Sequence, residues 1–501
     1  MITIKVERFV FFMAFLLLPA CQDQEPFVVT EKDMGVETTA VTAAIVPSGT
    51  ATVILPTLTA SPLPPTMPPP TPTRPSPTGS PPTPTGTPAL AYDCPLELPM
   101  VSGDIVASHA PLRVAFIAEN GIQLWDEASN ARTLLFEADD VSSLAFSDDR
   151  QLLAFTRQNE QYQISLWVMG AGGQDARELL SAADLLALNL SPTKDLAVDP
   201  YRLAWIPGTH RLTFSTRTLT TGDGLPDVFQ ELRVIDADTG SLVDLINDAE
   251  GGTYTFSPDG DFFVRASDTS VSLFQLSGEL VAGDIVTYPA LGLGGYTYHP
   301  PINWDDDSQT FALATINTAD SLEGTYSPDV TSTIYRIAVD GSVSELATMT
   351  GMAQDHVFSP DLEKVAFMRN SPKGPPLREL HIADVRNAWD IIYREGETLF
   401  FGQWNPAGDA LQFIFSDARG DYSIGRLCHD AEPLPSVSGP GFTNKVQWVD
   451  ATSYLYMALP EGDLYLGSLD GSQKLVGRMD ADRVLGKEGP LKNFDVYRPG
   501  S

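Results

Sequence analysis

Hydrophobic residues along most of the chain fall in short runs that alternate with polar positions and are separated by Asp, Gly, Ser and Pro. Residues 254–267, YTFSPDGDFFVRAS, show the pattern plainly: a run ending in an aromatic residue, a Ser-Pro-Asp-Gly turn and a second run. Alternation with a period of two predicts half-buried β-strands, and the turn residues predict a tight hairpin. We expect no amphipathic helix longer than a turn or two, with 176–190 the best candidate.

The hairpin pattern is one copy of a repeat. Further copies lie at 144–157, 203–216, 302–315, 356–369, 402–415 and 446–459. Their aromatic residues at the end of the first run are spaced 44 to 59 positions apart, and second hairpins such as 232–245 follow them. Four strands per unit at this period predict radially stacked sheets, because stacking buries the faces of each sheet. A further unit at 112–136 lacks its inner strand, which would come from 100–108 or from the C-terminal tail.

The predicted fold class is therefore all-β, an eight-bladed β-propeller, with seven blades as the alternative if the first and last fragments share a blade. The Ser-Pro-Asp-Gly repeats resemble the TolB-like, or WD40-like, propeller repeats of exported bacterial proteins over about residues 112–478. Ser257–Gly260 carries the full tetrapeptide, whereas 359–361 lacks the glycine. The resemblance implies a fold and not a function, and its turn residues are expected to build blades and not a site.

The first twenty residues have the pattern of an export signal. Lys5 and Arg8 precede ten apolar residues at 9–18, a run too short to span a bilayer. The following Leu-Pro-Ala-Cys at 18–21 resembles the lipobox of bacterial lipoproteins, with Pro19 as an unusual member. The resemblance implies cleavage before Cys21 and lipidation of that cysteine; the alternative is an ordinary secretory signal. We expect an extracytoplasmic protein attached to the membrane by lipid.

Residues 47–90 consist largely of Pro and Thr and show no core-forming periodicity. Such a segment cannot bury enough apolar surface to fold and favours extended polyproline conformations. We therefore divide the chain into a lipoprotein signal peptide at 1–20, a disordered Pro/Thr-rich linker at 21–90 and the propeller at 91–501. The linker would hold the propeller away from the membrane.

Two further cysteines, Cys94 and Cys428, lie near the two ends of the predicted propeller. Export would place them where a disulfide persists. Sequence spacing leaves two alternatives open, a disulfide that joins them or two unpaired thiols.

Charge and motifs exclude several function classes. The chain has 31 Lys and Arg against 65 Asp and Glu, a net charge of −34, which disfavours nucleic acid as a partner. The Gly-x-Ser-x-Gly elbow of serine hydrolases and the His-Glu-x-x-His zinc motif are both absent from the sequence. We expect no cofactor, no metal and no catalytic residues.

Candidate binding residues lie in segments that lead into the innermost strands. The richest is 288–304, where Tyr288, Tyr296, Tyr298 and His299 could stack on a sugar or a peptide. Arg202, Asp355, His356 and Lys445 are also candidates, because each lies just before a predicted inner strand. The leading hypothesis is a binding module for a protein, a peptide or an envelope glycan. The alternatives are an extracytoplasmic glycan-active enzyme with its site in the channel, and a purely structural envelope component.

Overall fold

The computed structural model describes residues 111–188, 197–219, 228–248, 251–293, 296–317, 329–352, 356–396, 398–416, 421–426, 432–433, 446–458, 462–480 and 494–497. All of them belong to the second of two units, Ala89–Ser501. Within these ranges the secondary structure is almost entirely β-strand, with one short helix, α1 (Ala182–Ala187).

Eight four-stranded antiparallel sheets make up the described structure. One contains β34 (Phe494–Tyr497), β1 (Arg113–Ala118), β2 (Gly121–Asp126) and β3 (Ala131–Glu137). The next contains β4 (Val141–Phe146), β5 (Leu152–Gln158), β6 (Ile164–Gly170) and β7 (Arg177–Leu180). A third contains β8 (Ala197–Trp205), β9 (Arg211–Leu219), β10 (Leu232–Asp236) and β11 (Leu242–Ile246). A fourth contains β12 (Thr253–Phe256), β13 (Phe262–Ala266), β14 (Ser270–Gln275) and β15 (Leu280–Thr287).

The remaining four sheets continue in chain order. β18 (Asn303–Trp304), β19 (Thr310–Ile316), β20 (Asp329–Ala338) and β21 (Val343–Met352) form the fifth. β22 (Val357–Phe358), β23 (Lys364–Asn370), β24 (Arg378–Asp384) and β25 (Asp390–Gly396) form the sixth. β26 (Thr398–Trp404), β27 (Ala410–Ser416), β28 (Asp421–Arg426) and β29 (Glu432–Pro433) form the seventh, and β30 (Val446–Trp448), β31 (Ser453–Ala458), β32 (Asp463–Ser468) and β33 (Gln473–Arg478) form the eighth. A small hairpin, β16 (Gly292–Leu293) and β17 (Tyr296–Thr297), precedes β18.

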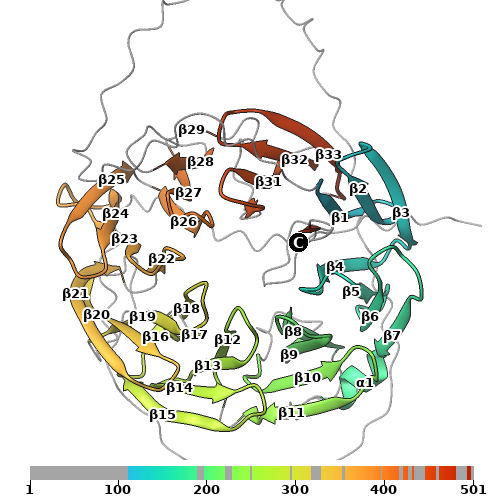
Figure 1. The fold of residues 1–501 in the computed structure, drawn as a ribbon, viewed down its shortest axis with the longest axis horizontal. Helices are drawn as coiled ribbons and strands as arrows, with labels where there is room; N and C mark the ends of the chain where they lie inside the picture. Colours follow the sequence, from blue (N-terminus) through green and yellow to red (C-terminus); the bar gives the residue numbers. More distant parts are fainter. Residues whose placement is uncertain are drawn as a thin grey trace, which may run out of the picture. The chain divides into compact units, whose positions relative to one another are not determined.

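The sheets are arranged radially, with β4, β8, β12, β18, β22 and β26 toward the centre and β3, β7, β11, β15, β21 and β25 at the outside (Figure 1). Radial four-stranded sheets are the architecture of a β-propeller. The sequence left the inner strand of the 112–136 unit open between 100–108 and the tail. The structure assigns it to the tail, because β34 pairs with β1 through Phe116↔Phe494 to Arg113↔Tyr497.

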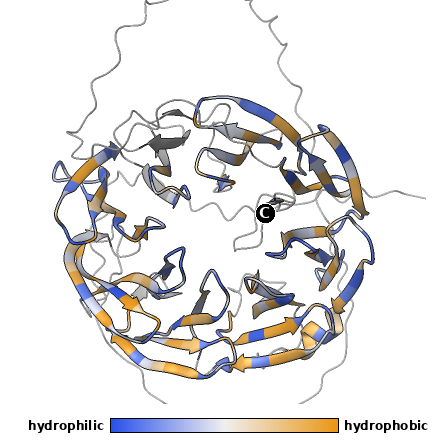
Figure 2. Ribbon diagram, viewed as in Figure 1, coloured by the Kyte–Doolittle hydropathy of each residue, from blue (hydrophilic) through white to orange (hydrophobic). Residues whose placement is uncertain are grey.

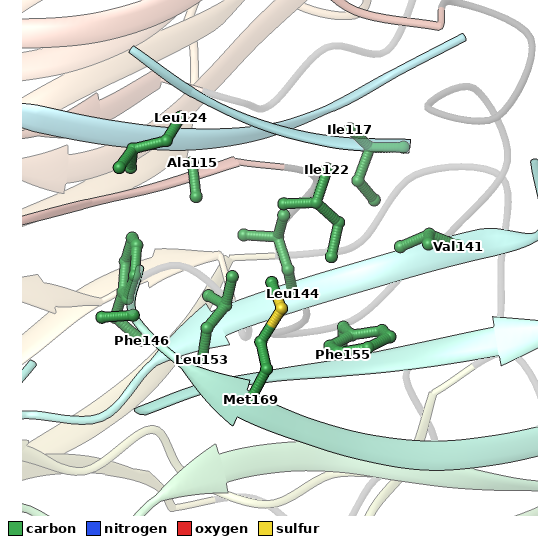
Figure 3. Packing of buried hydrophobic residues seen from close by; sticks show 11 residues of the cluster. Ala115, Ile117, Ile122, Leu124, Val141, Leu144, Phe146, Leu153, Phe155 and Met169 are labelled. Atoms are coloured by element: carbon green, nitrogen blue, oxygen red, sulfur yellow. The ribbon is translucent and has the colours of Figure 1, made fainter. Parts of the chain in front are cut away.

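Apolar residues gather in the strands, and the turns between them are mainly hydrophilic (Figure 2). Facing sheets bury these residues against each other. Ala115, Ile117, Ile122 and Leu124 from β1 and β2 meet Leu144, Leu153, Phe155 and Met169 from β4, β5 and β6 (Figure 3). A second cluster packs Val114, Phe116 and Trp125 on Leu455, Leu464 and Val476 from β31, β32 and β33. The sheet that holds both β1 and β34 therefore packs on both of its neighbours.

The aromatic residues that mark the sequence repeat also connect neighbouring sheets. Four indole Nε1–H groups donate to backbone carbonyls of the preceding sheet: Trp205 to Ala145 at 3.0 Å, Trp304 to Thr255 at 3.3 Å, Trp404 to Val357 at 3.0 Å and Trp448 to Gln403 at 3.2 Å. Each acceptor directly precedes the marker aromatic of its own sheet. The repeated bond accounts for tryptophan at four of the seven marker positions; the phenylalanines at the other three have no N–H to donate.

The Ser-Pro-Asp-Gly turn is held by its serine. Ser257 Oγ donates to Asp259 Oδ1 at 2.6 Å and accepts from the Phe262 amide at 3.0 Å, so one buried hydroxyl supports both sides of the turn. The fourth turn residue has a left-handed backbone, with φ of +75° at Gly260 and +53° at Leu362. Glycine adopts this conformation without steric cost, and Leu362 adopts it at the equivalent position of the sixth sheet. The expectation that these residues build blades agrees with this geometry.

Helix α1 lies within 176–190, the segment expected to be the best helical candidate. Ser181 caps it, since its side chain accepts from the Asp184 amide while Asp184 accepts from the Ser181 amide. Among the described residues, no helix is both long enough and apolar enough to cross a membrane.

Candidate functional site: the loop edge around Arg202

The two edges of the sheets differ. At the edge that we call the turn edge, first and second strands are joined by 147–151, 206–210, 257–261, 305–309, 359–363 and 405–409, each five residues long. The opposite edge, the loop edge, holds the connections from one sheet to the next and those between second and third strands. These connections vary in length. Residue 397 alone joins two sheets, whereas 181–196 carries α1 and 288–302 carries the β16–β17 hairpin. Variable loops on a regular scaffold are where binding sites usually lie.

The aromatic segment 288–302 is at the loop edge, and two of its tyrosines are buried. Tyr288 and Tyr298 are each 7% exposed. The Tyr288 hydroxyl donates to the Ser267 carbonyl oxygen, and the Tyr298 hydroxyl donates to Ala314 O at 3.4 Å. Both rings therefore shape the segment in this conformation, and their contact with a ligand stays a prediction. Tyr296 lies in β17, and its side chain is outside the described residues.

His299 is held at the junction of two sheets. Its Nε2 is 3.1 Å from Oδ1 of Asp268, which lies between β13 and β14 and has a side chain that is 56% exposed. Burial lowers the pKa of His299 and the nearby charge of Arg202 lowers it further, while the bond to Asp268 opposes both. At neutral pH the imidazole of His299 is therefore uncharged, and it lies beside the exposed carboxylate of Asp268.

Arg202 has an unusual backbone for a residue inside a strand. It lies in β8, in a bulge where Tyr201 pairs with Ser215 but Ala204 pairs with Thr213. Its φ is +56°, and among the described residues with positive φ other than glycine, only Arg202 and Asp284 lie inside strands. A left-handed backbone costs a non-glycine residue about 1–2 kcal/mol, and such strain concentrates at functional sites. The bulge directs Leu203 into the core and leaves Arg202 half-buried.

The Arg202 guanidinium has weak partners. It lies 5.2 Å from the centre of the Tyr201 ring, and Nη1 donates to Gly252 O at 3.4 Å. Arg217 also lies over Tyr201, at 5.0 Å, but its Nη2 pairs with Asp199 Oδ2 at 2.5 Å. No carboxylate lies within ion-pair distance of Arg202 in the described ranges. One of two similar arginines is thus neutralised and the other is not.

A buried charged pair, Glu231 and Arg233, lies in the sheet that also holds Arg202. Glu231 Oε1 accepts from the Thr216 amide at 2.9 Å and from Thr216 Oγ1 at 2.5 Å, and it lies 3.5 Å from Arg233 Nε. Burial raises the pKa of Glu231, and these bonds offset only part of the effect. Glu231 Oε2 has no hydrogen-bond partner among the described residues.

His356 enters β22 as a fully buried side chain. Its ring stacks on Phe367, with centroids 5.8 Å apart, and Phe367 stacks on His381 at 5.2 Å. Burial lowers the pKa of His356 to about 4. The His356 side chain therefore lies in the interior of the protein, against Phe367, and not on an exposed rim.

The remaining candidates cannot be placed. Cys21, Cys94, Cys428, Asp355 and Lys445 lie outside the described residues. Sequence reasoning missed Tyr201 and Asp268, which the structure places beside Arg202 and His299 respectively. Asp268 follows the Ser267 turn and was detectable as a hairpin residue, but nothing local in the sequence indicates the bulge at Arg202.

The described residues contain no group of three His, Cys, Asp or Glu side chains arranged to hold a metal ion. What the loop edge offers around Arg202 is one unneutralised guanidinium, one neutral imidazole and an exposed carboxylate. This set suits recognition by hydrogen bonds and charge.

Comparisons with known proteins are consistent with the fold but not informative about function. No family model and no curated protein matches the chain. Among solved structures, TolB from Acinetobacter baumannii has 14% identity, covering 56% of this chain and 62% of its own, with a TM-score of 0.27. Oligogalacturonate lyase from Vibrio parahaemolyticus has 13% identity, covering 69% and 89%, with a TM-score of 0.39. Dipeptidyl peptidase 4 from Porphyromonas gingivalis has 13% identity, covering 67% and 53%, with a TM-score of 0.43. Similarities this weak assign no activity or ligand.

Proposed function

We propose that the protein is a lipid-anchored, extracytoplasmic binding module. In this proposal the eight four-stranded sheets are the eight blades of a TolB-like propeller. The 21–90 linker joins the propeller to a lipid on Cys21. A protein, peptide or envelope glycan binds at the loop edge.

The observation that carries the proposal is Arg202. A left-handed backbone at an arginine of an innermost strand costs stability, and in the described ranges its guanidinium has no carboxylate partner to offset that cost. A ligand group would use the guanidinium that the fold leaves available. The variable loop edge, set against the uniform turn edge, supports the same location.

Proximity cross-linking on intact cells tests the binding function. The full chain carries the cross-linker, and a control carries residues 1–90 alone. One or two envelope proteins enriched by the full chain over the control would support the proposal. Equal labelling in both would overturn the protein and peptide forms of it.

The anchor has its own test. Replacing Cys21 with Ser is expected to move the protein from the membrane fraction to the soluble extracytoplasmic fraction. Retention of Cys21→Ser in the membrane fraction would contradict lipidation at this residue.

One observation favours the enzyme as a second candidate. A buried carboxyl with a raised pKa is suited to general-acid catalysis, and Glu231 is such a group. Its side chain is only 3% exposed and bonds within its own sheet, which favours a structural role. Glycan cleavage by the native chain that is lost in Glu231→Gln, with unfolding unchanged, would favour the enzyme.

A further inference from the structure

We propose that Arg202 anchors a carboxylate of an acidic peptide segment that lies along the free edge of β8. The inference rests on the proposed binding function and names the chemistry of the partner. Three features carry it: the available guanidinium, the free edge of β8 and the occupied aromatic faces near the site.

The guanidinium is positioned for a planar anion. Arginine can bind a carboxylate through two parallel N–H···O bonds. Tyr201 supports Arg202 from one side at 5.2 Å, and the single bond to Gly252 O is long at 3.4 Å. Within the described ranges the guanidinium makes this one hydrogen bond and no ion pair, which leaves N–H groups for a ligand.

The backbone beside Arg202 suits an extended chain. The sheet order β11-β10-β9-β8 leaves one side of β8 without a partner strand among the described residues. Free strand edges hydrogen-bond extended peptides, and alternate side chains of the peptide then meet fixed positions. Pro200 lacks an N–H, so the available stretch begins after it, at Tyr201 and Arg202.

A sugar has less to bind near Arg202. Sugars stack on open aromatic faces, but Tyr201 is covered by Arg202 and Arg217 at 5.2 and 5.0 Å. Tyr288 and Tyr298 are buried. A peptide is therefore favoured over a glycan at this position.

The net charge of −34 repels an acidic partner at long range. Arg202 therefore provides selectivity at contact and does not steer the partner toward the site. We expect slow association at low ionic strength that becomes faster as salt screens the repulsion.

The test uses the full chain in detergent micelles on a peptide array in which each sequence is printed with Asp or Glu, with the matching amides, and with Lys. An array of neutral and acidic glycans is probed in parallel. The native chain is expected to bind acidic peptides over their amide versions. Arg202→Gln should weaken that binding about ten- to hundredfold, the usual effect of losing a charged hydrogen bond. Arg202→Lys should lie between the two, because lysine keeps the charge but not the paired geometry.

The matched control is Arg386→Gln, an arginine of the turn edge whose side chain is 52% exposed. It should bind like the native chain. Equal binding of acidic and amide peptides, unchanged binding by Arg202→Gln, binding of glycans alone, or no peptide binding by the native chain would each overturn the proposal. If cross-linking captures a partner and Arg202→Gln captures it equally, the acidic-peptide site fails while the binding function stands. If cross-linking captures nothing beyond the control, the protein and peptide forms of the binding function fail together with the acidic-peptide site.

Discussion

The backbone amide of Phe146 donates a 2.8 Å hydrogen bond to Oδ2 of Asp495, across a separation of 349 positions in the chain. The other carboxylate oxygen of Asp495 accepts from Gln447 Nε2 at 3.1 Å. Asp495 lies in β34, Phe146 in β4 and Gln447 in β30, so one buried carboxylate joins three innermost strands. The last strand of the chain is thereby fixed to the sheets on both sides of it.

Asp495→Ala is expected to destabilise the fold by about 1–3 kcal/mol, because the Phe146 amide is left buried without its acceptor. Urea unfolding followed by tryptophan fluorescence measures the change. Asp306→Ala, at an exposed turn position, is the control and should stay within about 0.5 kcal/mol of the native protein. Equal stability of the two variants would mean that the bond from Phe146 to Asp495 does not stabilise the contact between β4 and β34.

Gly260→Ala should destabilise more than Gly240→Ala, although both glycines have left-handed backbones, with φ of +75° and +73°. An added Cβ at Gly260 would lie 2.3 Å from Pro207 O in the neighbouring sheet, whereas at Gly240 nothing lies within 4 Å. The conformational penalty of about 1 kcal/mol is common to both, so the difference measures the close approach of the two turns. A gap of about 1 kcal/mol or more in unfolding free energy is expected, and equal losses would contradict this packing.

His356 should make the protein sensitive to acid. Its pKa falls to about 4 by burial, while an unfolded histidine titrates near 6.5. Between these values the unfolded chain binds the proton and the folded chain does not. The stability that the neutral, buried His356 gives the fold is therefore complete above pH 6.5. The free energy of unfolding should decrease by about 3 kcal/mol as pH falls from 6.5 toward 4. His356→Phe, which keeps the stack on Phe367, should flatten the acid side of a plot of melting temperature against pH.

His210 should act in the opposite direction. Burial opposes its charge, but hydrogen bonds to Asp238 and Asp149, each 2.8 Å long, outweigh burial and raise its pKa. A raised folded pKa gives stability that is complete below the unfolded value of about 6.5 and is lost as pH rises through the folded value.

The melting temperature of His210→Gln should therefore differ from that of the native protein below pH 6.5, and the difference should shrink as pH rises above it. His210, in the β8–β9 turn, bonds to Asp149 in the β4–β5 turn of the neighbouring sheet and to Asp238 in the β10–β11 turn of its own sheet. The expected change in stability therefore reports partly on the contact between the two sheets. A difference that stays constant from pH 6 to pH 9 would show that folding does not raise the pKa of His210.

The repeated hairpins could be predicted from the sequence because they are local. Alternation around Phe256 and Phe262, and the Ser257 turn between them, depend on residues within one short segment. The inner strand of the first unit could not be chosen, because the pairing of Arg113 with Tyr497 depends on how the two ends of the folded region meet. Only the structure reports that long-range contact.

The candidate site was less accessible to prediction for a related reason. The sequence finds the tyrosines of 288–302 but not whether their rings face a ligand or the core. Tyr288 and Tyr298 are buried. Arg202 was a candidate by position alone. Its left-handed backbone follows from the register of β8 against β9, which no local pattern encodes.

The backbone of Arg202 permits a test that separates strain from binding. At a position with φ of +56°, the glycine variant should be more stable to unfolding than the alanine variant by about 1 kcal/mol or more. Arg202→Gly should therefore be more stable than Arg202→Ala in urea unfolding. Arg211, an exposed residue of β9 without a positive φ, is the matched control. There the order should reverse, with glycine less stable than alanine by about 0.5–1 kcal/mol. If alanine is the better residue at both positions, the strand is not strained at Arg202, and the main argument for a binding role at this residue is lost. If the order reverses as expected, the glycine variant folds at least as well as the alanine variant. Loss of the cross-linked partner in both Arg202 variants would then show that binding needs the guanidinium and not only a stable fold.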